Sequence, residues 1–401
     1  MLFALSLILL GGVAIGVSAL LLQTLAVAYH LRQKAAAPRK SPPISILKPL
    51  CGVDDRLEEN LSCFARLDYP TYEVVLGVKD TRDPAYPVAV AALKKWPGIF
   101  RLELQRGEPG FNPKVNQLIT LEAVARHDIL VVSDSNTQVD KDYLCGIAQA
   151  FEDETVACVT HPVVGVGEQT LGSRMDNLHL TSCVAAGQIS AKRVAGKDLV
   201  IGKSMALRRS DLNAMGGFYA MKDYLAEDYV IGRWVSDKLN RKRVVVAQGR
   251  VLNISEKKTL KNFYARYERW AIIQRTAVTA VTNIGQTLMN PIPLTTLAFL
   301  LSPSTETLSI LGVVVAVRLA CDLTSARLLR QAPIVMEDVA AIFVKDFVLF
   351  HTWCRALLNN TVNWRGNELK VLPGSRLVPR DGDASGEFDK PEDTQTATGA
   401  A

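Results

Sequence analysis

The sequence predicts an α/β domain with a mostly parallel sheet, held between hydrophobic segments at the two ends of the chain. Three observations support this. Residues 2–29 contain no charged side chain, a second apolar zone begins near residue 277, and short apolar runs alternate with helical patterns in between. Long uncharged runs indicate membrane-spanning helices, and alternating strands and helices indicate βαβ units.

Composition narrows the class of protein. The 401 residues are 48% hydrophobic and 21% charged, which excludes a disordered chain. Seven cysteines, none in a C-x-x-C pair, argue against a disulfide scaffold or a zinc finger. A net charge of +6 suits an anionic membrane surface or a phosphorylated substrate. It is too small and too scattered to indicate a nucleic-acid partner.

Residues 1–30 are expected to form an N-terminal transmembrane anchor. The 28 uncharged residues, rising about 1.5 Å each, exceed the roughly 30 Å hydrocarbon core. Four basic residues and no acid follow, at Arg32, Lys34, Arg39 and Lys40, which predicts that this end faces the cytosol. Residues 26–28 (Ala-Val-Ala) resemble a signal-peptidase site, but the basic start of a signal peptide is missing and the apolar run is too long. Gly12 and Gly16 have a spacing that can pack helices.

Residues 277–330 are expected to contain transmembrane helices. Residues 287–301 are predicted to cross once, interrupted by Pro291 and Pro293, and residues 307–329 to return. The turn at residues 302–306 carries no Lys or Arg, as expected on the outer side. Arg318 and Asp322 are expected to form an i,i+4 pair near the cytosolic end, because an unpaired charge in the membrane is costly.

Residues 334–358 are expected to form an interfacial or re-entrant helix. The segment mixes apolar residues with charged ones such as Asp338, Lys345, Asp346 and Arg355, and both its flanks are basic, so a full crossing would leave one basic flank outside. Residues 379–401 are acidic and rich in Gly, Thr and Ala, which predicts a disordered tail.

Residues 43–270 are expected to form the soluble domain. Its predicted strands lie at residues 44–47, 73–78, 127–132 and 156–159, and its predicted helices include residues 57–67 and 84–96. In such sheets ligands bind beyond the carboxyl ends of the strands.

Two acids fall at those strand ends. Asp80 could accept hydrogen bonds from a nucleotide, or could cap the helix at residues 84–96. Asp134 could hold a divalent cation against a diphosphate, or could simply form a turn with Ser135 and Asn136.

Two further groups of residues are candidates. Glu227 and Asp228 precede a helix, where one could be a general base or both could only complement the helix dipole. Arg266, Arg269 and Trp270 share one helical face. They could bind a diphosphate and a sugar, or could meet lipid headgroups beside the membrane.

The sequence resembles the ceramide glucosyltransferases. The resemblance runs in order over about residues 41–376 and ends in Asn363-Trp-Arg-Gly366. The other elements that carry it are Ser45-Ile-Leu-Lys-Pro-Leu-Cys-Gly-Val-Asp54, Leu67-Asp-Tyr-Pro-Thr-Tyr-Glu-Val74, Asn112-Pro-Lys-Val-Asn116, Ser133-Asp-Ser135, Ala226-Glu-Asp228 and Arg266-x-x-Arg-Trp270. Any one motif is common, whereas the ordered set of three acids with the Arg-x-x-Arg-Trp motif is specific.

The resemblance implies a multi-pass membrane glycosyltransferase of the inverting kind, with a GT-A-type domain facing the cytosol. It also implies a UDP-sugar donor, a membrane-lipid acceptor, and a divalent cation, Mg2+ or Mn2+. By position, Asp80 would contact the uridine, Asp134 would hold the metal and diphosphate, and Asp228 would deprotonate the acceptor hydroxyl.

Other roles follow from the resemblance in the same way. Arg266, Arg269 and Trp270 would bind the diphosphate and close the site, while Lys114 and Asn116 would assist at the nucleotide. Residues 216–218 (Gly-Gly-Phe) resemble an acceptor-side loop. The chain departs from the broader pattern in two places. Residues 134–136 read Asp-Ser-Asn, not Asp-x-Asp, and Arg266 replaces the Gln of processive polysaccharide synthases. His161 is a candidate ligand, although a lone histidine is more often structural.

Three functions follow. The first is transfer of glucose from UDP-glucose to the primary hydroxyl of ceramide, giving glucosylceramide, which residues 67–70 and 112–114 favour. The second is transfer of N-acetylglucosamine, or another hexose, from a UDP-sugar to a hopanoid polyol or other membrane lipid. Bacterial relatives with that activity share residues 48–52 and 83–85. The third is a non-enzymatic membrane interaction protein, against which the intact acids and Arg269 argue.

Overall fold

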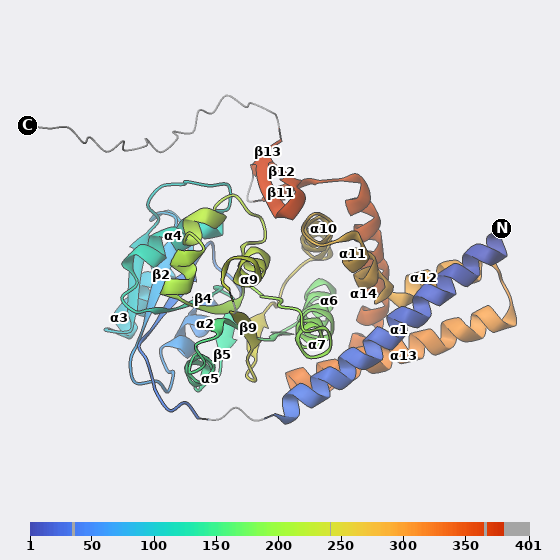
Figure 1. Cartoon of the computed structure of the whole chain (residues 1–401), viewed down its shortest axis with the longest axis horizontal. Helices are drawn as coiled ribbons and strands as arrows, with labels where there is room; N and C mark the ends of the chain where they lie inside the picture. The colour runs from blue at the N-terminus through green and yellow to red at the C-terminus, as the bar shows by residue number, and fades with distance from the viewer. Residues whose placement is uncertain (34–36, 241, 365–366, 381–401) are drawn as a thin grey trace, which may run out of the picture.

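The protein is described here from a computed structural model, which covers residues 1–33, 37–240, 242–364 and 367–380. An α/β domain lies on one side of the molecule, and the long helices α1 (Leu2–Arg32) and α13 (Thr305–Arg330) extend away from it on the other (Figure 1). The two ends of the described chain therefore belong to different parts of the molecule. The tail expected at residues 379–401 lies outside the described residues from residue 381 on.

The α/β domain is built on a seven-stranded sheet with strand order β3-β2-β1-β4-β8-β6-β9. The pairs β3–β2, β2–β1, β1–β4 and β6–β9 are parallel, and β8 runs antiparallel to both its neighbours. The strands are β1 (Ile44–Pro49), β2 (Tyr72–Val78), β3 (Phe100–Leu104), β4 (Ile129–Ser133), β6 (Val156–Thr160), β8 (Ser204–Arg208) and β9 (Arg243–Val246). The predicted mostly parallel sheet is confirmed, and its four predicted strands are β1, β2, β4 and β6.

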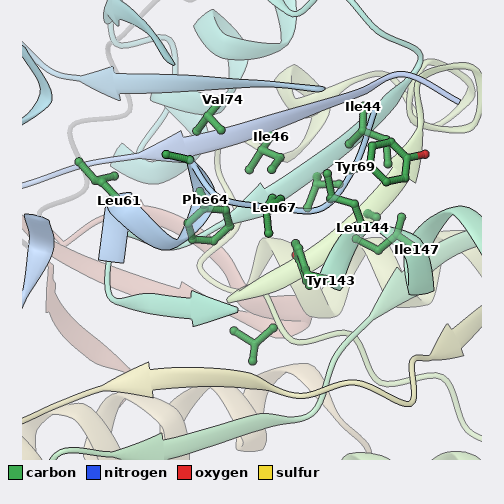
Figure 2. Packing of buried hydrophobic residues seen from close by; sticks show 14 of the residues in the cluster. Ile44, Ile46, Leu61, Phe64, Leu67, Tyr69, Val74, Tyr143, Leu144 and Ile147 are labelled. Carbon is green, nitrogen blue, oxygen red and sulfur yellow. The ribbon is translucent and has the colours of Figure 1, made fainter. Parts of the chain in front are cut away.

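Helices cover both faces of this sheet because successive strand residues point to opposite sides. Ile44 and Ile46 of β1 pack with one set of helices, whereas Leu47 packs with the other. The first set is α2 (Leu57–Phe64), α3 (Ala85–Lys95) and α5 (Tyr143–Ala150), and the second is α4 (Pro113–Val124), α8 (Arg209–Ala214) and α9 (Glu227–Lys238). Figure 2 shows the first layer, where Phe64 and Tyr143 meet edge to face with ring centroids 6.3 Å apart.

A small second sheet joins the domain to the helices beyond it. It has the order β5-β10-β7, formed by β5 (Thr137–Val139), β10 (Val251–Ile254) and β7 (Val163–Val166). The chain then runs through α6 (Leu171–His179), a π-helical turn at Leu180–Ala185, and α7 (Ala186–Ala195). α10 (Leu260–Ala277) packs against α6 and against α14 (Met336–Leu358). π-Helical turns often mark functional positions.

Within the part of the chain that the structure describes, two helices, α1 and α13, are long and apolar enough to cross a bilayer. A third crossing exists only if α11 (Ala280–Leu288) and α12 (Pro291–Leu301) count as one span, and these two are bent by 79°. The expected crossing at residues 287–301 is therefore not one continuous helix. Pro291 starts α12, where its missing N–H costs nothing. The interfacial placement expected for residues 334–358 stays a prediction, although a helix does form there as α14.

Gly16 allows α1 to approach this bend closely. A Cβ at Gly16 would lie 1.9 Å from the carbonyl oxygen of Leu288, and one at Gly12 would lie 3.0 Å from the Leu288 side chain. Small residues at this spacing let helix backbones come into contact in a membrane. Further down α1, Gln23 Nε2 donates to the carbonyl of Ser182 in the π-helical turn, 2.9 Å away. An N-terminal anchor that is not cleaved would make contacts of this kind with the rest of the protein.

Helices α13 and α14 meet at four buried charged side chains. Arg318 Nη1 lies 2.7 Å from Asp322 Oδ1 within α13, so the expected i,i+4 pair is confirmed. Arg318 Nε also reaches Asp346 Oδ2 of α14 at 2.9 Å, and Lys345 Nζ reaches Asp322 and Asp346 at 3.2 and 3.0 Å. All four are at most 1% exposed, and their charges balance. We call Arg318, Asp322, Lys345 and Asp346 the α13–α14 charge cluster.

A C-terminal meander packs beside α9 and α10. It consists of β11 (Thr361–Trp364), β12 (Asn367–Leu372) and β13 (Arg376–Pro379), all antiparallel. Leu225 N donates to Ser375 O at 2.8 Å, and Leu377 N donates to Asp223 O at 2.7 Å. The meander therefore holds residues 223–226, the segment that leads directly into α9.

Candidate active site

A cavity of about 600 Å³ opens at the carboxyl ends of β1 and β4. This is the position at which α/β sheets bind ligands. Its lining includes five basic side chains and three carboxylates. These charged residues are Lys114, Lys203, Lys258, Arg266, Arg269, Asp54, Asp134 and Asp228. The lining also includes Leu180 of the π-helical turn and Trp270 of α10.

Asp134 lies between two lysines. Its Oδ1 is 2.9 Å from Lys114 Nζ, and its Oδ2 is 3.2 Å from Lys203 Nζ. Burial alone would raise the pKa of Asp134, but the two ammonium groups outweigh it and hold the pKa below its usual range. The carboxylate is therefore charged at neutral pH and stabilised by these two cations.

Lys48 supports the turn that carries Asp134 through hydrogen bonds from the core of the domain. This side chain is fully buried, and its Nζ donates to Asp134 O at 2.6 Å and to Thr137 Oγ1 at 3.1 Å. Burial lowers the pKa of Lys48 to about 7. The ammonium also lies 3.9 Å from the centroid of the Phe64 ring. Lys48 thus anchors the turn that carries Asp134 to the core of the domain.

Asp228 lies at the first turn of α9 and reaches into the cavity. Its Oδ2 accepts from Gly202 N at 2.6 Å, and its Oδ1 accepts from Tyr229 N at 2.8 Å. Burial and then the neighbouring charge of Glu227 raise the pKa of Asp228 to about 6, against the opposing effect of Lys114. A carboxylate with a pKa near neutrality can accept a proton from a reacting hydroxyl.

Lys114 connects Asp134 to Glu227. Its Nζ lies 2.9 Å from Asp134 Oδ1 and 2.9 Å from Glu227 Oε1, and donates to Gly202 O at 3.0 Å. Lys114 extends from the first turn of α4, which is capped by the side chain of Asn112. One side chain therefore sets the distance between the Asp134 turn and the start of α9.

Arg266 is held by an acid that sequence reasoning missed. Asp176 of α6 is fully buried, and both its oxygens accept from Arg266 Nη1 at 3.1 Å. Lys258 and the Tyr267 hydroxyl also donate to Asp176. Burial followed by the charge of Arg266 lowers the pKa of Lys258 to about 7. The alternative in which Arg266 meets lipid headgroups does not match this arrangement, because its guanidinium points into the protein.

Trp270 completes that side of the cavity. Its ring lies under the Arg266 guanidinium, 4.9 Å from centroid to Cζ, and meets the Tyr267 ring edge to face. Trp270 also packs against a buried cluster that includes Ala326 of α13. The face shared by Arg266, Arg269 and Trp270 therefore lies between the charged cavity and the long apolar helices.

Two of the sequence-predicted residues do not line the cavity. Asp80 lies on an exposed loop after β2, where it accepts from Arg82 N at 2.7 Å and pairs with Arg82 Nη2 at 2.9 Å. It does not cap α3, since Asp83 accepts from Ala85 N there instead. The Asn116 side chain is buried and exchanges hydrogen bonds with the backbone of Gly110.

His161 and residues 216–218 also lie outside the lining. His161 is buried, its Nδ1 lies 3.0 Å from Ser204 Oγ, and burial lowers its pKa to about 3. This is a structural histidine. Gly216 and Gly217 both have positive φ, at 98° and 67°, and Phe218 is buried in the core.

The residues that were missed share a weak sequence signal. Lys203, Asp176 and Lys258 lie in segments with no recognisable motif. Only the pairing of β8 with β4 and the packing of α6 against α10 bring them to the cavity. For Lys203, the one sequence feature that hinted at a site residue is its position directly before a strand.

The side chains at Asp134 offer few ligands for a divalent cation. Within the described ranges, no three His, Cys, Asp or Glu side chains gather to hold a metal ion. Asp134 supplies a single carboxylate, and Asn136 supplies an amide oxygen. The ammonium of Lys203 lies where these two oxygens converge, 3.2 and 2.9 Å away. In this arrangement the residues do not fit a divalent cation.

Comparisons with known proteins identify relatives of the whole chain. The chain is 27% identical over 244 residues to ceramide glucosyltransferase 1 of Caenorhabditis elegans, covering 60% of this chain and 52% of that relative. It therefore spans about half of that protein. It is 23% identical over 364 residues to ceramide glucosyltransferase 3 of the same organism, covering 88% of this chain and 77% of the relative.

A solved structure shares the fold. A mannosyltransferase from Pyrobaculum calidifontis, in complex with GDP-Man and Mn2+, matches with a TM-score of 0.52 and 17% identity, covering 86% of this chain and 99% of the other. The predicted GT-A-type fold is thereby confirmed. The model of glycosyl transferase family 21 matches residues 9–377, nearly the whole described chain. The chain belongs to glycosyl transferase family 21, and it carries helices long and apolar enough to cross a membrane.

Proposed function

We propose that this enzyme transfers glucose from UDP-glucose to the primary hydroxyl of ceramide, with inversion at the sugar. The observation that carries the proposal is Asp228, a carboxylate with a pKa of about 6 at the wall of a cavity whose lining is otherwise rich in cations. Names of relatives in Caenorhabditis elegans support ceramide as the acceptor.

In the proposed reaction Asp228 removes the proton from the acceptor hydroxyl as its oxygen attacks the anomeric carbon. The bond from that carbon to the diphosphate breaks on the opposite face, and UDP leaves. The basic side chains of the lining stabilise the charge that develops on the diphosphate. Arg266 and Arg269 act on the membrane side, and Lys114 acts on the nucleotide side.

Asp80 keeps its proposed role at the uridine if the nucleotide displaces Arg82 from its carboxylate. Its carboxylate is bonded to Arg82, which holds the pKa of Asp80 below its usual range. The two side chains are 37% and 88% exposed, so their pairing contributes little stability. A uridine would displace Arg82 at small cost. Asn116 would assist by holding the loop at Gly110, not by contact with the nucleotide.

The catalytic domain is proposed to face the cytosol. The ends of α1 and α13 that reach the α/β domain are the basic ends. His30 Nε2 lies 3.1 Å from Ala247 O, and Arg330 Nη1 pairs with Glu168 Oε1 at 2.9 Å. Basic ends remain in the cytosol under the positive-inside rule. Trp270, packed against α13, would then receive the lipid at the membrane boundary.

A second acceptor is favoured by one observation. The elements shared with bacterial hopanoid glycosyltransferases, residues 48–52 and 83–85, contact each other, since Gly52 N donates to Asp83 Oδ1 at 2.8 Å. This pair forms a single structural unit beside the cavity. Transfer of N-acetylglucosamine from a UDP-sugar to a hopanoid polyol is therefore the alternative. The non-enzymatic reading is set aside, because the family is one of glycosyltransferases.

Lipid mass spectrometry tests the proposal. Membranes that contain the full chain would receive ceramide or a hopanoid polyol, each with UDP-glucose or UDP-N-acetylglucosamine. We expect a hexosylceramide with UDP-glucose only. A glycosylated hopanoid would keep the chemistry and replace the acceptor. Failure to modify any lipid in all four combinations would contradict the proposed function.

The rate should depend on pH through Asp228. A general base acts only when deprotonated, so we expect the rate to rise with pH through about 6 and to level off above it. Four groups face this carboxylate: the Gly202 and Tyr229 N–H groups, the Lys114 ammonium and the Glu227 carboxylate. Because Glu227 raises the pKa, Glu227→Gln should move the inflection to lower pH. Initial rates of lipid product formation across the pH range measure both, and an unchanged inflection would contradict the assignment.

A further inference from the structure

We propose that Lys203 takes the place of a divalent cation at the Asp134-Ser135-Asn136 turn and binds the donor diphosphate. The inference rests on the proposed function for its UDP-sugar donor. It concerns a residue that carries no motif, and it follows from where the sheet places that residue.

The first argument is position. Lys203 Nζ lies 3.2 Å from Asp134 Oδ2 and 2.9 Å from Asn136 Oδ1, the first and third side chains of the turn. These are the two side chains that an Asp-x-Asp turn would offer to a metal. The other oxygen, Asp134 Oδ1, lies 2.9 Å from Lys114 Nζ. Both oxygens of the single carboxylate are therefore bound to ammonium groups.

The second argument is that the sheet imposes this position. Ser204 of β8 pairs antiparallel with Ser133 of β4. The pairing continues one residue further, where Asp134 N donates to Lys203 O at 3.3 Å. Lys203 is thus the cross-strand partner of Asp134, and directly opposite side chains interact most strongly. Its side chain is 13% exposed, so it is also enclosed by the cavity wall.

The third argument is charge. A metal at this site would balance the negative charge of a diphosphate, and lysine can serve as a point charge for phosphate. Lys114 and Lys203 both lie at the Asp134 carboxylate, so two ammonium groups are available to a diphosphate at this turn. A divalent ion at the same two oxygens would lie against the Lys203 ammonium and be repelled by it. Asn136, where many enzymes carry a second acid, makes the turn a weak metal ligand but a good acceptor for an ammonium.

Calorimetry of UDP binding to the purified full chain tests the proposal. In the presence of EDTA, the unmodified protein should bind UDP about as tightly as with Mn2+. Lys203→Met should weaken UDP binding in EDTA by about tenfold or more, because it removes a charged hydrogen-bond donor. Mn2+ should then restore part of the affinity, since both oxygens of the turn are released. Lys197→Met, at an exposed lysine of the same region, is the matched control and should leave UDP binding unchanged.

Several results would overturn the proposal. UDP binding of the unmodified protein that is lost in EDTA and restored by Mn2+ would assign the site to a metal, while leaving the proposed function intact. This measurement needs no variant, so a folding defect in Lys203→Met does not weaken the test. Unchanged UDP affinity of a folded Lys203→Met in EDTA would also refute the role of Lys203. Absence of UDP binding under every condition would instead refute the nucleotide-sugar donor itself.

Discussion

Asp228→Asn should abolish transfer to the lipid while leaving UDP binding intact. The substitution keeps the shape of the side chain and can still accept from Gly202 N, but it removes the group proposed to take the acceptor proton. General base catalysis contributes about 10²–10⁴-fold, and we expect kcat to fall by that factor. Rates of lipid product formation, together with calorimetry of UDP binding, measure the two effects separately.

Asp237→Asn provides the control for this experiment. Asp237 lies on the same helix, α9, and is exposed, with Arg233 Nε 3.0 Å from its Oδ2. Its loss should cost less than about 1 kcal/mol and leave kcat unchanged. If Asp228→Asn retained full turnover, the base would have to be another group. Glu227 would then be the next candidate, because its carboxylate lies on the same helical turn.

Asp176→Asn should destabilise the protein and weaken donor binding together. Asp176 is fully buried and accepts from Arg266, Lys258 and Tyr267, so its neutralisation leaves two buried cations without their carboxylate. Breaking a buried ion pair from one side costs about 3–5 kcal/mol. Release of Arg266 should also raise the KM for the UDP-sugar by about tenfold or more. Thermal unfolding and steady-state kinetics measure these two effects.

Asp338→Asn is the control that separates an effect on stability from an effect on donor binding. Asp338 of α14 is also buried and lies 2.8 Å from Arg174 Nη1 of α6, the helix that carries Asp176. Its loss should lower the unfolding temperature but leave the KM for the UDP-sugar unchanged, because Arg174 does not line the cavity. An equal rise in KM for both variants would mean that Asp176 acts only through overall stability.

Much of the fold could be predicted because its signals are local. Apolar runs bounded by polar residues correspond to β1, β2, β4 and β6, and the uncharged N-terminal run corresponds to α1. The rule that ligands bind beyond the carboxyl ends of strands predicted a place for Asp134 at the cavity, because this rule depends only on the order of elements along the chain. The same rule did not bring Asp80 there, because its neighbour Arg82 pairs with it on an exposed loop.

The rest depends on contacts that lie far apart in the sequence. Lys203 meets Asp134 only because β8 inserts antiparallel beside β4, and no local pattern announces that pairing. Asp176 lies on a polar stretch of α6 that gives no sign of full burial. The 79° bend between α11 and α12 also differs from the predicted single crossing. Proline signalled an interruption there, but no local pattern indicates the direction of the chain after it, and the bend packs closely against α1 at Gly16.

The α13–α14 charge cluster bears on how the protein is assembled during synthesis. Each helix carries its own neutral pair, Arg318 with Asp322 at 2.7 Å and Lys345 with Asp346 at 3.0 Å. Helix α13 leaves the ribosome first, and its internal pair lowers the cost of entering lipid before α14 exists. When α14 arrives, the two dipolar pairs join through Arg318 and Asp346. An alignment shifted along either helix would separate Arg318 from Asp346, so we expect this docking step to favour the native register in the nascent chain.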